Sequence, residues 1–320
     1  MHKYLSGEKQ LSPAVRQNVF PILTAMIWGT AFVAQSVGAD YLEPFTFNAA
    51  RAVVGALTLL AFILFTRRFE TDKAKEAHGS KKDILIGGIL CGLIITIAMN
   101  IQQIGMEETA AGKAGFLASL YILVVPVVGI FFKKKVPLNV WIGVLIGTLG
   151  LYFLCVTESF TIQKSDAYVL VSAFMFSMHI LVIDHFSAKV SGVYLSCVQF
   201  VVAGILSGIL AFVAETPTIA DIMRAAGPVL YIGIVSCGIG YTLQIVSQKG
   251  SNPTMVSLLL SLESVFSVIS GAIILGEQMS GREYFGCVLM FTAVILSQIP
   301  VKNILKRRKK GDKQLDIAKS

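Results

Sequence analysis

Residues 254–275 read TMVSLLLSLESVFSVISGAIIL, and this stretch decides the fold class. It contains a single charged group, the carboxyl group of Glu263. A helix rises ~1.5 Å per residue, so a stretch of this length crosses the ~30 Å hydrocarbon core of a bilayer. Glu263 would then lie near the middle of the membrane, where an ionised carboxylate is costly. The stretch therefore predicts a membrane-spanning helix whose acid is either protonated or paired.

The rest of the chain has the same character. Of its 320 residues, 55% are hydrophobic and 14% are charged, against about 25% charged in a typical soluble domain. The mean hydropathy is +0.73. Ten apolar stretches have the length of a membrane span, which predicts an all-α polytopic membrane protein; they are residues 19–38, 45–66, 84–104, 112–132, 138–156, 167–184, 193–214, 228–247, 254–275 and 283–300.

The basic residues predict how the chain crosses the membrane. The net charge is +8, and the Lys and Arg residues flank apolar stretches instead of forming a surface typical of nucleic-acid binding. Alternating loops place 22 of them on one side and four on the other, counting the tails. By the positive-inside rule we expect a cytoplasmic-membrane protein with both tails, residues 1–17 and 301–320, in the cytoplasm. The first span lacks a convincing cleavage site, so we expect it to be retained and not removed as a signal peptide.

Local motifs refine this interpretation. Capping residues mark three helix starts: Ser80 with Asp83, Asn252 with Pro253, and Ser280 with Glu283. We expect the spacing of small residues at 143/147, 204/208 and 267/271 to serve close helix packing. No CxxC pair occurs, so the cysteines predict neither a disulfide framework nor a metal site and are interpreted as packing residues; they are Cys91, Cys155, Cys197, Cys237 and Cys287.

The two halves of the sequence repeat weakly. Residues 118–154 align with residues 261–297 at an offset of 143, which places Gly143 on Gly286. Near the start of each half the offset is 148, which places Arg51 on Gln199 and Trp28 on Phe176. Because each unit contains an odd number of spans, five, the second unit enters the membrane from the opposite side. We therefore predict two inverted five-helix repeats, residues 18–156 and 166–300.

These motifs resemble a known family. The string from Pro253 to Glu263, the Leu275-Gly276-Glu277 turn, Gly286, the Trp28-Gly29-x-x-Phe32 motif and Arg51 are similar to the EamA family of the drug/metabolite transporter superfamily, over about residues 18 to 300. The resemblance implies ten helices in inverted repeats around a central cavity. It also implies activities such as export, uptake or exchange of amino acids and metabolites. The sequence departs from the pattern at three places: Lys134 replaces a turn glutamate, Ser264 replaces a proline, and Pro126 lies five residues late.

Two charged residues within the spans are the strongest candidates for a functional site. Glu263 shares a helix face with Ser267 and Ser270, and it either exchanges a proton during transport or makes a static hydrogen bond. Arg51 lies in the second span on the face of Asn48. Its guanidinium group must extend to the membrane surface, pair with an acid or bind an anionic group of a substrate.

The other candidates are weaker. Trp28, Tyr121, Tyr241 and Gln244 would line a cavity or pack, and Asn100 lies on a polar face of the third span. Gln199 is the repeat mate of Arg51. His179 is a proton relay or a packing residue, and its HxxxxD spacing to Asp184 is interpreted as chance. Lys113 either anchors a span at the interface or captures a substrate carboxylate.

We therefore predict a secondary carrier that moves a small metabolite, amino acid or drug-like solute by alternating access, with export favoured. It would act as a monomer or homodimer in the lipid bilayer, without a cofactor or metal, and the absence of a Walker A motif argues against ATP hydrolysis. One alternative is a membrane-embedded enzyme for lipid or prenyl substrates, which would need an acid cluster such as DDxxD. The other is a membrane scaffold, which would not need a buried acid.

Overall fold

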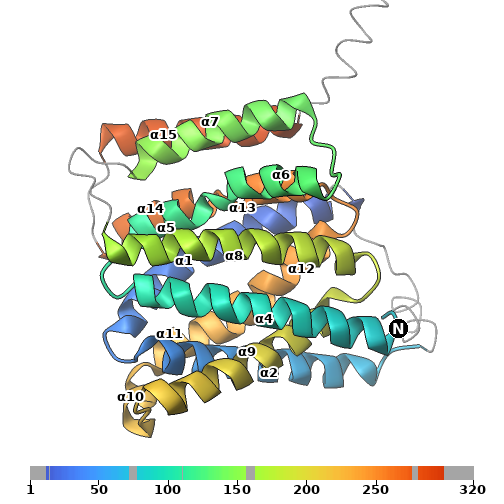
Figure 1. Cartoon of the computed structure of the whole chain (residues 1–320), viewed down its shortest axis with the longest axis vertical. Coiled ribbons are helices and arrows are strands. Elements are labelled where there is room, and N and C mark those ends of the chain that lie inside the picture. Colours follow the sequence, from blue (N-terminus) through green and yellow to red (C-terminus); the bar gives the residue numbers. More distant parts are fainter. Residues whose placement is uncertain are drawn as a thin grey trace, which may run out of the picture.

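The computed structural model describes residues 12–13, 15–71, 78–109, 111–155, 163–275 and 280–298, and in these residues it consists of helices and connecting turns without a β-strand (Figure 1). A π-helical turn, Val15–Val19, leads into the first helix. The helices of the first half are α1 (Phe20–Ala39), α2 (Pro44–Arg67), α4 (Lys81–Gly105), α5 (Ala111–Ser119), α6 (Tyr121–Phe131) and α7 (Leu138–Cys155). Those of the second half are α8 (Lys164–Ser187), α9 (Gly192–Ala214), α10 (Ile219–Arg224), α11 (Ala226–Tyr231), the π-helix η2 (Ile232–Gly240), α12 (Tyr241–Gln248), α13 (Pro253–Leu260), α14 (Glu263–Leu275) and α15 (Gly281–Gln298).

Eight helical spans within the described residues are long and apolar enough to cross a membrane. This confirms a polytopic all-helical protein. The expected fifth span is an apolar helix of shorter length, Leu138–Leu154. The expected tenth span corresponds to α15, which begins with the polar residues Arg282 and Glu283. The number of ten spans therefore stays a prediction. Residues 1–11 of the N-tail, the C-tail and the Gly276-Glu277 turn lie outside the described residues.

Three spans are not the uninterrupted α-helices that their hydropathy predicts. The fourth is divided at Leu120 into α5 and α6, and the ninth is divided at Ser261 and Leu262 into α13 and α14. The eighth contains the π-helix η2. Serine side chains explain part of the second break, because the Ser261 and Ser264 hydroxyl groups donate to carbonyl oxygens three residues earlier, which competes with regular helix bonding.

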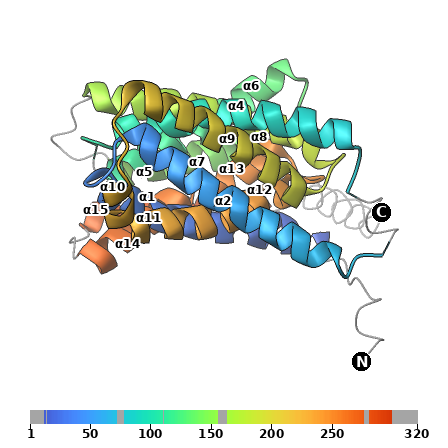
Figure 2. The ribbon, with the colours of Figure 1, turned by 90° about the horizontal axis from the view of Figure 1, so that it is seen from below.

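The helices pack in pairs drawn from the two halves of the chain. α2 packs against α9, α7 against α15, and α4 against both α8 and α9. The broken spans also meet, with α5 against α14 and α6 against α13. Figure 1 shows α7 and α15 as a pair at one end of the molecule, and Figure 2 shows α2 crossing it beside α9.

Close contacts at glycines hold one of these pairs, α7 and α15. A Cβ atom added at Gly286 would lie 2.6 Å from the Leu154 backbone nitrogen and 2.8 Å from the Gly150 carbonyl oxygen. A Cβ atom at Gly143 would lie 3.0 Å from the Ala293 carbonyl oxygen. These glycines therefore let α7 and α15 approach backbone to backbone. Gly208, by contrast, has nothing within 4 Å of such an atom, so this position of the 204/208 spacing makes no close contact.

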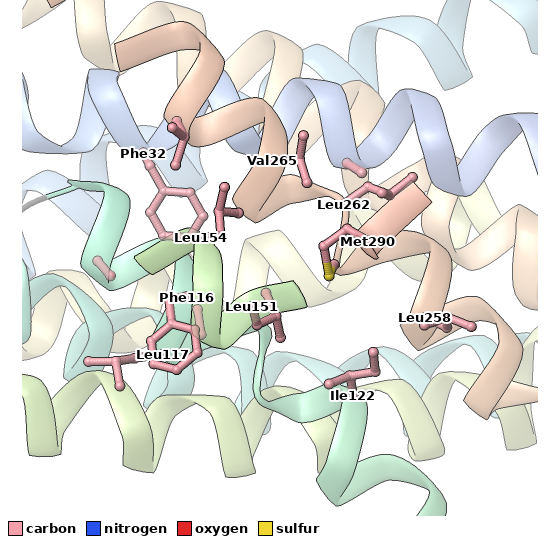
Figure 3. Packing of buried hydrophobic residues seen from close by; sticks show 14 of the residues in the cluster. Phe32, Phe116, Leu117, Ile122, Leu151, Leu154, Leu258, Leu262, Val265 and Met290 are labelled. Atoms are coloured by element: carbon pink, nitrogen blue, oxygen red, sulfur yellow. The ribbon is translucent and has the colours of Figure 1, made fainter. Parts of the chain in front are cut away.

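A buried apolar cluster joins α1 and the broken spans to the α7–α15 pair. Phe116 and Leu117 of α5, Leu151 of α7 and Val265 of α14 belong to it (Figure 3). Met290 reaches the same cluster from α15. The cluster fixes the two helix breaks against a common core, because residues on both sides of each break contribute to it.

Two of the three predicted helix caps form side-chain hydrogen bonds, and the third does not. The Asn252 side chain accepts from the Thr254 N–H at 3.0 Å, and Ser280 with Glu283 forms the predicted capping box. Ser80 is the N-cap residue of α4, with Asp83 in the first turn as predicted, but its side chain makes no cap hydrogen bond. Cys91, Cys197 and Cys237 are buried and unpaired, as the packing interpretation requires.

Candidate functional site

A cavity lies between α1, α2, α4, the broken spans and α8. The volume of the cavity is about 40 Å³. Six of the ten predicted site residues line it: Trp28, Arg51, Tyr121, Tyr241, Gln244 and Glu263. Spans from both halves of the chain thus contribute to one pocket, which no single half could form.

Glu263 is the first residue of α14, directly after the second break. Its side chain is buried with 4% exposure, and its Oε1 accepts a hydrogen bond from the Ser119 hydroxyl group at 3.3 Å. Ser119 is the last residue of α5, directly before the first break. The two breaks therefore meet at the Glu263 carboxyl group, with the cavity-lining residue Tyr121 as a close neighbour.

A glycine contact places α1 against this acid. A Cβ atom at Gly29 would lie 2.4 Å from the Cβ of Phe266 and 2.8 Å from the Glu263 carbonyl oxygen. The Ser270 hydroxyl group donates to the Gly29 carbonyl oxygen at 3.3 Å. The predicted stripe of Ser267 and Ser270 therefore faces neighbouring helices, since Ser267 also donates to the Ala111 carbonyl oxygen.

Arg51 is held inside the protein and does not extend to the membrane surface. Its exposure is 4%, its NH1 donates to Oε1 of Gln35 at 3.0 Å, and its guanidinium group lies 5.5 Å from the Phe47 ring centroid. Within the described residues it forms no ion pair, and its Nε has no hydrogen-bond partner. Gln103 donates to the Gln35 carbonyl oxygen at 3.3 Å and so supports the side of the site that holds Arg51.

Aromatic rings form much of the remaining wall. Trp28 and Tyr241 lie with ring centroids 4.7 Å apart, in a tilted arrangement. Tyr241 is in electrostatic range of both Arg51 and Glu263. The Gln244 side chain is 1% exposed, and its Oε1 has no partner among the described residues. The site thus offers flat apolar surfaces together with unsatisfied polar atoms.

His179 and Gln199 lie next to this wall but do not line the cavity. The His179 ring is 6.0 Å from that of Tyr241, and its Nε2 is 3.0 Å from Oε1 of Gln199. Asp184 forms an ion pair with Lys134 instead of orienting His179. The HxxxxD spacing therefore places no base beside an acid, in agreement with its interpretation as chance.

Two further predicted residues, Lys113 and Asn100, also lie outside the cavity lining. Lys113 forms an ion pair with Asp166, with 2.5 Å between its Nζ and Oδ2 of Asp166. Asn100 bonds across three helices, accepting from Asn48 at 2.9 Å and donating to Ser207 at 2.9 Å. Asn100 thereby links α4 to α2 and α9.

The cavity includes residues that the sequence analysis did not select. Gln35, Gln102 and Ser236 add polar groups, and the apolar additions are Ala31, Phe32, Ala118, Phe176 and Ile180. Amide side chains within apolar spans could have identified Gln35 and Gln102, because such groups are costly in lipid. No group of three or more His, Cys, Asp or Glu side chains in the described part of the chain is arranged to hold a metal ion.

Comparisons with known proteins agree with this architecture. The model of the EamA-like transporter family matches the chain twice, over residues 17–156 and 163–298. An uncharacterized transporter of Archaeoglobus fulgidus is 28% identical over 87% of this chain and 84% of its own length. The uncharacterized transporter YoaV of Bacillus subtilis is 23% identical over 86% of this chain and 94% of its own length. A solved crystal structure has the same fold, with a TM-score of 0.71 and 17% identity over 91% of this chain and 98% of that one.

Proposed function

The chain belongs to the EamA-like transporter family, and from this membership and the central cavity we propose that this multi-pass membrane transporter is a secondary carrier working by alternating access. The observation that carries the proposal is the pair of charged groups in one cavity. Glu263 and Arg51 are both buried there, and each has a neutral hydrogen-bond partner instead of the other. Buried charges without counter-charges are costly, which favours a role in binding.

Helix packing supports two inverted repeats of five spans. In the broken fourth and ninth spans, the first half of each packs against the second half of the other, as expected of antiparallel mates. The mates α2 and α9 also pack together, as do α7 and α15. We propose ten spans, with units 18–156 and 166–300 and both tails in the cytoplasm. Since one chain encloses the cavity, a monomer suffices for transport.

The lining favours a small zwitterionic solute such as an amino acid. A guanidinium group binds a carboxylate through two parallel hydrogen bonds, and Arg51 has an unpartnered Nε for this purpose. Glu263 would accept the ammonium group, and the rings of Trp28 and Tyr241 would contact an apolar or aromatic side chain. We propose export as the direction.

Glu263 is the proposed coupling group. It would release its proton when the cavity opens to one side and rebind it from the other, and the paired helix breaks would let the segments on either side move. The Ser119 hydrogen bond would hold the carboxyl group in the closed form. The alternative role, a static hydrogen bond, predicts no dependence of transport on a proton gradient.

The test uses proteoliposomes with a panel of labelled amino acids and amphiphilic cations. We expect Glu263→Gln to lose the acceleration of net flux by a pH gradient while keeping exchange of labelled for unlabelled solute. Ser119→Ala is the matched control, because it removes the hydrogen bond but keeps the titratable group. Unchanged gradient dependence in Glu263→Gln would reject the coupling role, and no flux of any solute by the wild-type protein would leave the carrier proposal unsupported.

A further inference from the structure

A second hollow lies on the outside of the helical bundle, away from the central cavity. It is formed by α4, by the end of α8 and by the turn that follows α6, which lie side by side in Figure 1. The volume of the hollow is about 440 Å³. Its walls are apolar, and the lining residues are Leu90, Phe132, Met178, Leu181, Val182 and Phe186 with the polar Lys134, Asp184 and His185. We call it the α4–α8 groove.

The polar end of the groove carries excess positive charge. Lys134 forms an ion pair with Asp184, and Lys133 and Lys135 flank it in the same turn. Lys189 lies one turn beyond, where its Nζ donates to Nε2 of His185 at 2.8 Å and lies 5.6 Å from the Phe186 ring centroid. Lys134 pairs with the Asp184 carboxylate, and the other three lysines are an excess of positive charge at this end of the groove.

The backbone of this turn is strained at a lysine. The N–H of Lys134 bonds to the Gly129 carbonyl oxygen and that of Lys133 to the Ile130 carbonyl oxygen, the pattern that closes a helix with a left-handed residue. That residue is Lys133, at φ 56°, where glycine is the usual choice. A lysine at this position is less stable in this backbone conformation than a glycine would be, but it adds a cation at the end of the groove.

From these features we infer that the α4–α8 groove binds an anionic phospholipid. Its phosphate would lie among the lysines, and an acyl chain would lie along the apolar wall of Leu90, Leu181 and Val182. Basic pockets between membrane helices, at the level of the headgroups, are suited to such lipids. Charge complementarity selects an anionic lipid over a zwitterionic one, and the apolar wall selects a lipid over a free phosphate. The inference uses none of the residues that line the central cavity.

The test is native mass spectrometry of the purified full-length protein with added phosphatidylglycerol or phosphatidylcholine. We expect clearly tighter binding of phosphatidylglycerol. Because a lysine near a charged headgroup changes affinity about fivefold, Lys133→Gly should lower phosphatidylglycerol affinity by about that factor. The double variant Lys133→Gly with Lys189→Gln should lower it further, and phosphatidylcholine binding should stay unchanged. Leu90→Trp, which fills the exposed wall of the groove, should weaken binding of both lipids.

The controls separate this site from general attraction to lipid. Arg224→Gln removes an exposed cation that pairs with Asp221 on α10, away from the groove, and should bind phosphatidylglycerol as the wild-type protein does. Because Lys133→Gly relieves backbone strain, its melting temperature should equal or exceed that of the wild type, so lost affinity would not reflect misfolding. Equal binding of the two lipids, wild-type affinity in the double variant, or displacement of the lipid by glycerol phosphate would each overturn the inference.

Discussion

Arg51 is the only basic residue among the described residues that line the central cavity, and its environment determines what it can bind. The Gln35 side chain accepts a hydrogen bond from NH1 of Arg51, and the Phe47 ring lies beside the guanidinium group. Nε has no hydrogen-bond partner in the part of the chain that the structure describes. A lysine offers a single point charge in place of this fork. Arg51 therefore offers two parallel N–H donors of the kind that pair with a carboxylate, which a lysine lacks.

We predict that Arg51→Lys raises the KM for a carboxylate-bearing solute by about tenfold or more, because one charge-assisted hydrogen bond is lost. Concentration-dependent flux in proteoliposomes measures the effect. Lys164→Gln, an exposed cation at the start of α8, is the matched control and should leave KM unchanged. A wild-type KM in Arg51→Lys would remove Arg51 from the binding site.

Glu107, between the spans α4 and α5–α6, gives a prediction about pH. Partial burial, followed by the charges of Glu215, Glu108 and Glu43, raises the pKa of this carboxyl group. A raised pKa means that the folded protein binds this proton more tightly than the unfolded chain does. The carboxyl group therefore lowers the free energy of unfolding once the pH rises above its pKa in the unfolded chain. Glu107→Gln should therefore raise the melting temperature slightly at pH 8 and leave it unchanged at pH 4. Thermal unfolding at both pH values measures this, and an equal shift at both would contradict it.

At the scale of elements, the contact between α7 and α15 depends on glycines. Gly286→Ala would force a Cβ atom into the Leu154 backbone, so we predict destabilisation by ~1–3 kcal/mol. Gly208→Ala in α9 meets open space, and the gain in helix propensity should make it neutral or stabilising by up to ~1 kcal/mol. Thermal melting of the detergent-solubilised variants compares the two. Equal melting temperatures would show that α7 and α15 separate at little cost.

The sequence analysis could predict spans but not their interruptions. Hydropathy is averaged over a window of residues, so it predicts one continuous helix for residues 112–132 and one for residues 254–275. In the structure these helices are broken at Leu120 and Ser261. Local hydrogen bonds of Ser261 and Ser264 contribute to the second break, and such bonds leave no hydropathy signal. For the same reason Glu263 was recognisable as a buried acid, whereas its partner Ser119, 144 residues away, was not. Gln35 was missed although it is also a polar group in an apolar span.

At the scale of the whole molecule, the two repeats meet along mated helices. If the halves are inverted, the contacts between α5 and α14 and between α6 and α13 are equivalent under a twofold axis in the membrane plane. When the cavity changes from opening on one side of the membrane to opening on the other, the two halves would then swap conformations. The charges are not equivalent, because Arg51 is matched by Gln199, which bonds to His179 beside the cavity. The binding site would thus be asymmetric because of its side chains, although the backbone is symmetric.

The inverted arrangement makes a prediction about topology that can be measured in cells. Lys189, between α8 and α9, and Arg224, between α9 and α11, are exposed and lie at opposite ends of α9. We predict that a membrane-impermeant maleimide labels Arg224→Cys in intact cells and labels Lys189→Cys only after permeabilisation. The wild-type protein gives the background, since Cys91, Cys197 and Cys237 are buried. Tags at the two chain ends should both report the cytoplasm, because two units of five spans return the chain to the side where it began. Tags on opposite sides would require an odd number of spans, and the twofold relation between the halves would then fail.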